Sequence, residues 1–132
     1  MKLLRSQIDY GTFFPIQRAA VAALRGPRDY VKEQCRKYQE RRDVLCGGFR
    51  SIGWNVPDSE GTMFVWAPIP KGYKSSREFA MELVEKAGVL CTPGDAFGSL
   101  GEGYVRFALV LPPEELAKAV QAVADSGVLE RK

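Results

Sequence analysis

The sequence contains no histidine. This absence excludes a Ser-His-Asp triad, a histidine-ligated metal site and an imidazole general base supplied by this chain. Cysteine is scarce: Cys35, Cys46 and Cys91 are odd in number and have no C-x-x-C spacing. That pattern favours reduced thiols and a reducing compartment. We therefore expect a cytoplasmic protein.

Long apolar runs and charge of a single sign are also missing. No segment approaches the length of a membrane span, and the N-terminus lacks the apolar core of a signal peptide. The net charge is +3, and basic residues are scattered among acidic ones without a basic stripe. We expect neither a nucleic-acid nor a membrane partner. The 132 residues, 45% of them apolar, suffice for one domain with one core.

Proline, glycine and apolar periodicity predict four helices after an irregular or loosely helical start at residues 1–14. The first begins at Pro15 and runs to about Leu24, where Gly26-Pro27 interrupts it. The second is long, begins at Pro27 and ends near Gly47-Gly48 or Gly53. Its apolar face has a gap at Arg42, which predicts an extended side chain over apolar surface or an ion pair. The apolar residues of that face are Val31, Cys35, Tyr38, Leu45, Phe49 and Ile52.

Short branched and aromatic runs predict four strands, which alternate with two further helices. We place the strands at Trp54–Pro57, Thr62–Ala67, Val89–Thr92 and Tyr104–Val110, and the helices from Ser75 or Ser76 to Gly88 and from Pro112 to Gly127. This order predicts an α/β (α+β) sandwich. A small, mainly antiparallel sheet has helices packed on one face and follows a long helix.

In the segment from Gly88 to Pro113, the second predicted strand carries one arginine, Arg106, among apolar residues. Burial of a guanidinium is costly unless an anion meets it, and its planar fork suits a carboxylate. Three interpretations remain open from the residues alone: a carboxylate-binding site, an arginine that points to solvent from an edge strand, and a structural ion pair.

Three stretches resemble the C-terminal part of the class I/II aminotransferases, which are pyridoxal-phosphate enzymes of fold type I. Residues 10–24 (YGTFFPIQRAAVAAL) resemble the segment after the cofactor-lysine region, and residues 61–68 (GTMFVWAP) resemble a strand of the small domain. The third stretch resembles the C-terminal strand pair that carries the substrate-binding arginine. Its matching residues are Gly88, Val89, Pro93, Gly94, Phe97, Gly98, Gly101, Gly103 and Arg106.

The resemblance implies an interdomain segment with a short helix at residues 1–26 and an aminotransferase small domain at residues 27–132. It implies that Arg106 binds the α-carboxylate of the substrate. It places Phe97 on a glycine-rich loop near the site, where such a loop either moves on closure or is a plain turn.

The resemblance also implies that the segment containing Tyr10, Gly11 and Thr12 reaches the substrate site of a neighbouring subunit in a homodimer. A hydrophobic interdomain linker is the alternative for this segment. Gln17 is expected to bond backbone groups at the helix start.

The cofactor lysine of the family lies in a Ser/Thr-x-x-Lys setting, and none of the eight lysines here has Ser or Thr three residues before it. We therefore expect a fragment that is inactive alone and binds no pyridoxal phosphate specifically. Its parent enzyme would contain a further, N-terminal large domain and act on an amino acid and a 2-oxo acid.

Two alternatives stay open. One is a free-standing domain of ferredoxin-like fold that binds a carboxylate or has a regulatory role. The other is a decarboxylase or C–C lyase of the same fold type, because these enzymes also bind an α-carboxylate.

Overall fold

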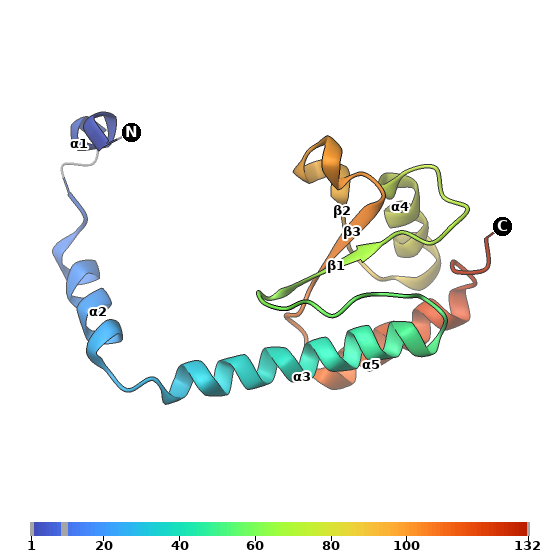
Figure 1. Ribbon diagram of the computed structural model, residues 1–132, viewed down its shortest axis with the longest axis horizontal. Coiled ribbons are helices and arrows are strands. Elements are labelled where there is room, and N and C mark those ends of the chain that lie inside the picture. The colour runs from blue at the N-terminus through green and yellow to red at the C-terminus, as the bar shows by residue number, and fades with distance from the viewer. Residues whose placement is uncertain (1, 9–10, 132) are drawn as a thin grey trace. The chain divides into compact units, whose positions relative to one another are not determined.

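The computed structural model describes residues 2–8 and 11–131 and divides the chain into two compact units, Met1–Gln34 and Cys35–Lys132. The domain boundary after residue 26 stays a prediction. Figure 1 labels the helices and strands. In chain order they are α1 (Lys2–Ile8), α2 (Phe14–Arg25), α3 (Asp29–Ser51), β1 (Phe64–Pro68), α4 (Ser76–Ala87), β2 (Thr92–Pro93), the 3-10 turns η1 (Gly94–Phe97) and η2 (Ser99–Gly101), β3 (Tyr104–Ala108) and α5 (Pro113–Ser126).

The predicted helix limits are confirmed where the local chemistry is clear. Pro15 occupies the first turn of α2, where its missing N–H costs nothing. Ser75 caps α4, since its Oγ accepts a hydrogen bond from the backbone N–H of Glu78 at 3.2 Å. Gly88 ends this helix in the left-handed region, with φ of 65°.

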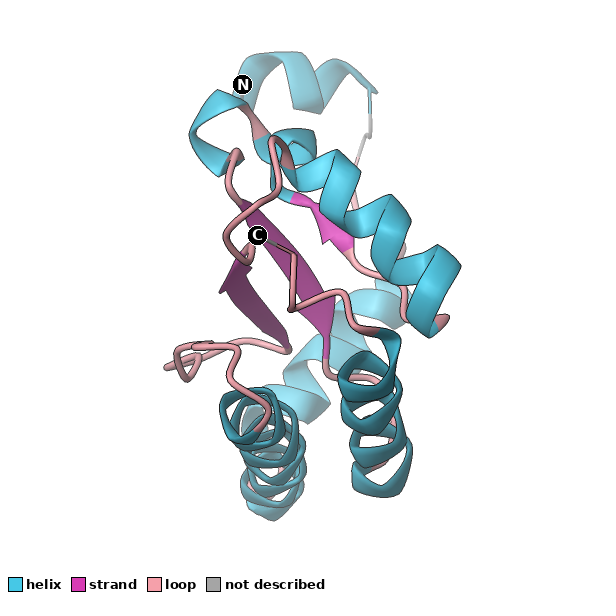
Figure 2. Cartoon of the chain, turned by 90° about the vertical axis from the view of Figure 1, so that its right-hand side faces the viewer, coloured by secondary structure: helices cyan, strands magenta, loops and turns pink. Residues whose placement is uncertain are grey.

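The three strands form one antiparallel sheet in the order β1-β3-β2. In the Cys35–Lys132 unit, α3, α4 and α5 lie on the same side of this sheet (Figure 2). The predicted architecture, a small antiparallel sheet with helices on one face, is confirmed. Alternation along the strands buries Val65, Ala67, Val105 and Phe107 on the helix side and leaves the opposite side uncovered by these helices.

Aromatic rings from four segments meet in the core of this unit. Phe49 of α3 lies 4.6 Å from Trp54 and 5.4 Å from Phe107, measured between ring centroids. Trp54 also contacts Phe79 of α4 at 5.3 Å. Tilted and edge-on geometries of this kind are the favoured ones for aromatic pairs. The cluster therefore joins both helices to the inner face of the sheet.

The helix α3 continues through Gly47-Gly48 instead of ending there. Gly48 faces α5, and a Cβ atom at this position would meet Val120 Cγ2 at 2.7 Å. The glycine thus permits a close approach of α3 and α5, while the chain turns only at Gly53, where φ is 88°.

Two predicted strands differ from the structure. Trp54–Pro57 forms no strand; the Trp54 indole is buried in the core and its Nε1 donates to the Pro68 carbonyl at 2.8 Å. The apolar composition of this segment suggested strand pairing. In the structure the Trp54 side chain holds the segment in place instead of hydrogen bonds to a neighbouring strand. The strand expected at Val89–Thr92 is reduced to the two-residue β2, whose partners on β3 are Arg106 and Val105.

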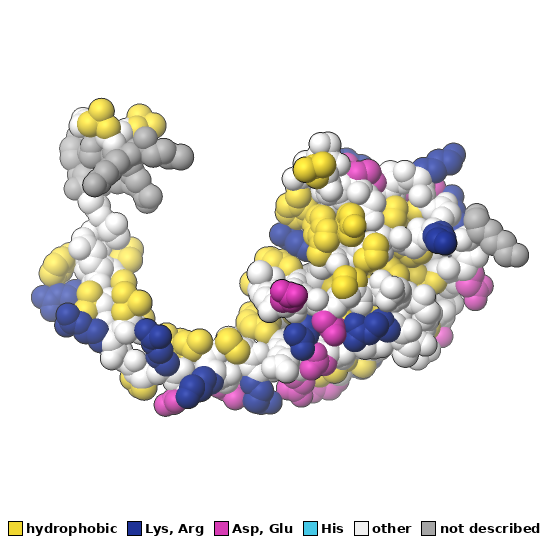
Figure 3. Space-filling model, viewed as in Figure 1, with side chains coloured by type: hydrophobic (Ala, Val, Ile, Leu, Met, Phe, Trp, Pro, Cys, Tyr) yellow, Lys and Arg dark blue, Asp and Glu magenta, His cyan; other side chains and the backbone are white. Residues whose placement is uncertain are grey.

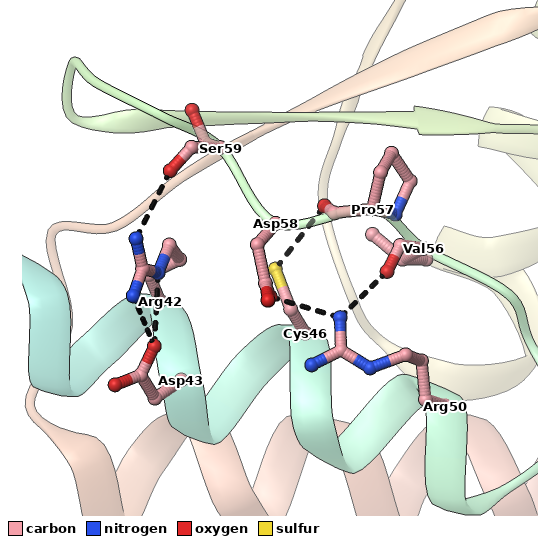
Figure 4. A network of polar contacts seen from close by, with 8 residues as sticks. All are labelled: Arg42, Asp43, Cys46, Arg50, Val56, Pro57, Asp58 and Ser59. Carbon is pink, nitrogen blue, oxygen red and sulfur yellow. Dashed lines mark hydrogen bonds and ion pairs between the residues drawn. The ribbon is translucent and has the colours of Figure 1, made fainter.

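The segment after α3 is fastened to that helix by a polar network (Figure 4). Arg42 donates to Asp43 Oδ1 at 2.6 and 2.9 Å and to the Ser59 carbonyl at 3.2 Å, so the predicted ion pair is confirmed. Arg50 donates to Asp58 Oδ1 at 2.8 Å, and this bond lowers the pKa of the Asp58 carboxyl. Burial raises the pKa of the neighbouring Cys46 thiol to about 11, which makes it a poor nucleophile at neutral pH.

Candidate functional site

Arg106 lies at the centre of the sheet, on the face opposite to the three helices. It is the third residue of β3, and its neighbours across the ladders are Trp66 on β1 and Thr92 on β2. The adjacent residues Val105 and Phe107 are buried on the other face. The strand period therefore directs the half-buried Arg106 side chain away from the core.

The guanidinium of Arg106 has no acceptor within the part of the chain that the structure describes. It makes no hydrogen bond and no ion pair there. The other six arginines of the Cys35–Lys132 unit each donate to a carboxylate or a carbonyl oxygen. They are Arg36, Arg41, Arg42, Arg50, Arg77 and Arg131. The structural ion pair weighed for Arg106 is absent among these residues, and its N–H fork is available to an external anion.

Two aromatic rings hold this guanidinium. Arg106 Cζ lies over the Phe64 ring, 4.1 Å from its centroid, and over the Phe97 ring, 4.4 Å from its centroid. Both distances are well within the range of favourable cation–π contact. The side chain is therefore neither buried against a protein charge nor free in solvent.

The aromatic surroundings of Arg106 extend over the exposed side of the sheet. Trp66 stacks on Tyr104 with 5.6 Å between centroids, and its other neighbour, Phe97, meets it edge-on at 5.7 Å. Hydrophobic side chains gather on this face over β1, β3 and the loop after β2 (Figure 3). The exposed fractions are 37% for Trp66, 51% for Phe97 and 98% for Leu100.

The loop that carries Phe97 is a pair of 3-10 turns whose backbones lie in close contact. Gly94 and Gly101 are both buried, and a Cβ atom on either would collide with the backbone carbonyl of the other. The glycine pattern therefore reflects close backbone packing as well as turning. Only glycine at both positions allows η1 and η2 to approach this closely.

Two polar contacts join this loop to the start of α4. Glu102 accepts hydrogen bonds from the backbone N–H of Ser76 at 2.6 Å, from the Ser76 hydroxyl at 3.1 Å and from the backbone N–H of Gly103 at 2.9 Å. Arg77 Nε donates to Asp95 Oδ2 at 2.5 Å. The carboxylate of Glu102 is thereby placed at the positive end of a helix, where negative charge is stabilised.

The bonds from Ser76 and Gly103 lower the pKa of Glu102 below its ordinary value of 4.5. A carboxyl with a lowered pKa in the folded state stabilises the protein above its unfolded pKa, and this contribution disappears as the pH falls through the folded value. We expect Glu102→Ala to lower the thermal unfolding midpoint at neutral pH, and the difference from the unmodified chain to vanish in acid.

The matched control for this prediction is Glu114→Ala, which removes an exposed carboxylate from the first turn of α5. Melting curves by circular dichroism between neutral pH and pH values well below 4.5 measure both variants. A Glu102→Ala difference that persists unchanged in acid would contradict the role given to the charge.

The predicted site residues fall in both units. Phe97 and Arg106 are brought together in the second unit. Gly11 and Thr12 belong to the first unit, where the Thr12 carbonyl accepts a hydrogen bond from Gln17 Nε2 at 2.5 Å. Gln17 thus bonds the backbone before α2, as predicted. Tyr10 lies outside the described residues, and the substrate role of residues 10–12 stays a prediction.

Sequence reasoning missed three parts of this site. The cation–π contact of Phe64 with Arg106 has a signal in the sequence only in the two-residue alternation of β1. Glu102 and Ser76 are 26 positions apart, and no local pattern links them.

The sequence profile described as "Aminotransferase class I and II" matches residues 5–123. This chain belongs to that family. This chain resembles the LL-diaminopimelate aminotransferase of Moorella thermoacetica, with 46% identity over 118 residues, which make up 89% of this chain and 30% of that protein. It resembles the substrate-bound BacF structure of Bacillus subtilis, with a TM-score of 0.85 and 34% identity over 92% of this chain and 31% of that one. The structure of an aminotransferase from Staphylococcus aureus matches with a TM-score of 0.87 and 28% identity. The match covers 99% of this chain and 34% of that one.

This aminotransferase chain spans about a third of the length of the curated relatives that it matches. The family uses pyridoxal phosphate. No lysine of this chain has the Ser/Thr-x-x-Lys setting of the family's cofactor lysine, so these residues do not supply the group that would hold the cofactor covalently.

Among the described residues, no helix has the length and apolarity needed to cross a membrane. The same residues contain no cluster of three potential metal ligands.

Proposed function

We propose that this chain is the C-terminal part of a pyridoxal-phosphate-dependent aminotransferase that transfers an amino group between an amino acid and a 2-oxo acid. In this proposal Arg106 binds the α-carboxylate of the substrate. The observation that carries it is the unpartnered guanidinium of Arg106, held by Phe64 and Phe97. A planar fork with free donors binds a carboxylate by two parallel hydrogen bonds.

LL-Diaminopimelate is the amino-acid substrate that the relatives favour. Several curated relatives with 38–46% identity bear the name LL-diaminopimelate aminotransferase. Arg106 would bind the part that every α-amino acid shares. Selection of the remaining substrate atoms would then rest on residues outside this chain.

We further propose that the parent enzyme is a cytoplasmic homodimer and that a large domain outside this chain supplies the cofactor lysine. The segment with Tyr10, Gly11 and Thr12 would reach the neighbouring subunit. The absence of a suitable lysine supports the view that the chain is inactive by itself. Division of one site between domains is common, because ligands often bind where domains meet.

A hybrid aminotransferase tests this function. Its design replaces the segment of the Moorella thermoacetica enzyme that matches this chain, over 118 residues, with the corresponding residues of this chain. We expect the hybrid to transfer the amino group of LL-diaminopimelate to a 2-oxo acid, and the isolated chain to show neither activity nor a stoichiometric cofactor absorbance band. A hybrid that folds and binds the cofactor but transfers no amino group would contradict the proposal, as would activity of the isolated chain.

A further inference from the structure

We propose that Phe97, together with Phe64, is a positioning residue that orients the Arg106 guanidinium for carboxylate binding. This inference rests on the proposed function and extends it to residues that donate no hydrogen bond to substrate. Three observations support it: the ring contacts of Arg106, the fixed conformation of the loop with Phe97, and the exposure of the Phe97 side chain.

Arg106 is held by contacts that leave its donors available. An arginine side chain has several rotatable bonds, and fixing them costs binding free energy when a ligand must do it. Phe64 and Phe97 restrict the guanidinium through ring contacts at 4.1 and 4.4 Å from Cζ, without using any N–H group. The conformational entropy of the Arg106 side chain is therefore already reduced before a carboxylate binds.

The rings also displace water from the guanidinium. An ion pair between a guanidinium and a carboxylate gains strength as the local dielectric constant falls. Trp66 lies directly across the ladder from Arg106 and meets Phe97 edge-on at 5.7 Å, so a third ring supports the arrangement. The three rings thus strengthen the attraction at the free edge of the fork.

The position of Phe97 is fixed by the loop rather than by burial of its ring. The close contact of Gly94 with Gly101 fixes η1, the Arg77–Asp95 ion pair joins η1 to α4, and Glu102 bonds the end of η2 to the start of α4. The Phe97 side chain itself is 51% exposed. A substitution of this ring is accordingly expected to leave the fold intact, which separates positioning from stability.

The test compares Phe97→Leu, Phe97→Tyr and Leu100→Ala in the full 132-residue chain. Leucine keeps apolar volume without a ring face, tyrosine restores the ring, and Leu100 is a 98% exposed neighbour in the next turn. The chain labelled with 15N is titrated with pyruvate, and with pyruvamide as the uncharged counterpart. The Arg106 Nε–Hε resonance reports both binding and the ring-current shift from Phe97.

We expect Phe97→Leu to remove the ring-current shift and to weaken pyruvate binding roughly 3- to 30-fold, the range of a partly desolvated cation–π contact. Phe97→Tyr is expected to restore both, Leu100→Ala to change neither, and pyruvamide to bind none of the variants.

Two outcomes separate the inference from the function on which it rests. Equal pyruvate affinity of Phe97→Leu and the unmodified chain, with binding lost in Arg106→Ala, would overturn the positioning role and leave the carboxylate site intact. Pyruvate binding that is absent from the unmodified chain, or unaffected by Arg106→Ala, would overturn both. In the hybrid aminotransferase, Phe97→Leu is expected to raise KM more than it lowers kcat, and a fall confined to kcat would count against positioning.

Discussion

Replacement of Arg106 by alanine in the hybrid aminotransferase is expected to lower kcat/KM for the amino-acid substrate. The expected loss of transition-state stabilisation is about 2–5 kcal/mol, the usual cost of truncating one partner of a desolvated charge pair. The guanidinium has no acceptor among the described residues, so its removal deprives the substrate carboxylate of a partner without unpairing a protein group. Steady-state kinetics with LL-diaminopimelate and a 2-oxo acid measure the loss.

Two further variants make this result specific to the fork. Arg106→Lys keeps the charge but not the planar pair of donors, and is expected to fall between arginine and alanine. Lys118→Ala removes an exposed cation of α5 that pairs with Glu115, and is expected to match the unmodified hybrid. The absorbance of the bound cofactor should survive in all three. Unchanged kinetics in Arg106→Ala would refute the assignment of this residue.

Gly101→Ala is expected to lower the free energy of unfolding by about 1–3 kcal/mol or more, because the new Cβ atom meets backbone that cannot rotate aside. The atoms in its way belong to Gly94, and the reciprocal substitution at Gly94 meets the carbonyls of Gly101 and Tyr104. Displacement of η1 would also carry Phe97 away from Arg106, so pyruvate affinity should fall together with stability.

The matched control is Gly47→Ala in the C-terminal part of α3, where an added Cβ atom meets nothing within 4 Å. Alanine costs less backbone entropy than glycine in a helix, so this variant is expected to be neutral or more stable by about 0.5–1 kcal/mol. Chemical denaturation of the two variants beside the unmodified chain measures the contrast. An unfolding free energy of Gly101→Ala equal to that of the unmodified chain would show that η1 and η2 are not packed as described.

The sequence predicts the features that depend on local chemistry. Pro15, Ser75 and Gly88 mark helix limits because each acts through its own backbone or cap. Arg106 is conspicuous because a charge within an apolar strand needs a reason, and the family pattern supplies one. The two-residue period of a strand likewise places Val65 and Phe64 on opposite sides of the sheet, where the structure has them.

Features that depend on distant residues were not predictable in this way. The segment at Trp54 has strand-like composition, but its conformation is set by an indole that bonds to the carbonyl of Pro68. The contact of Phe97 with Arg106 and the bonds of Glu102 to Ser76 join segments that only the fold brings together. The glycine spacing indicates a turn. The close contact between Gly94 and Gly101 joins two backbone segments, and local spacing does not predict it.

A guanidinium that has no acceptor among the described residues and lies over two aromatic rings binds any small carboxylate, whether a metabolite or a buffer component. Acetate, formate and citrate used in purification or crystallisation present the same pair of oxygens to Arg106, and at the concentrations customary for buffers they would compete with a weak physiological ligand. For the carboxylate binding proposed for Arg106, preparations in cationic amine buffers with chloride at low ionic strength are therefore the appropriate reference state, and affinities obtained in carboxylate buffers would understate the affinity for the substrate.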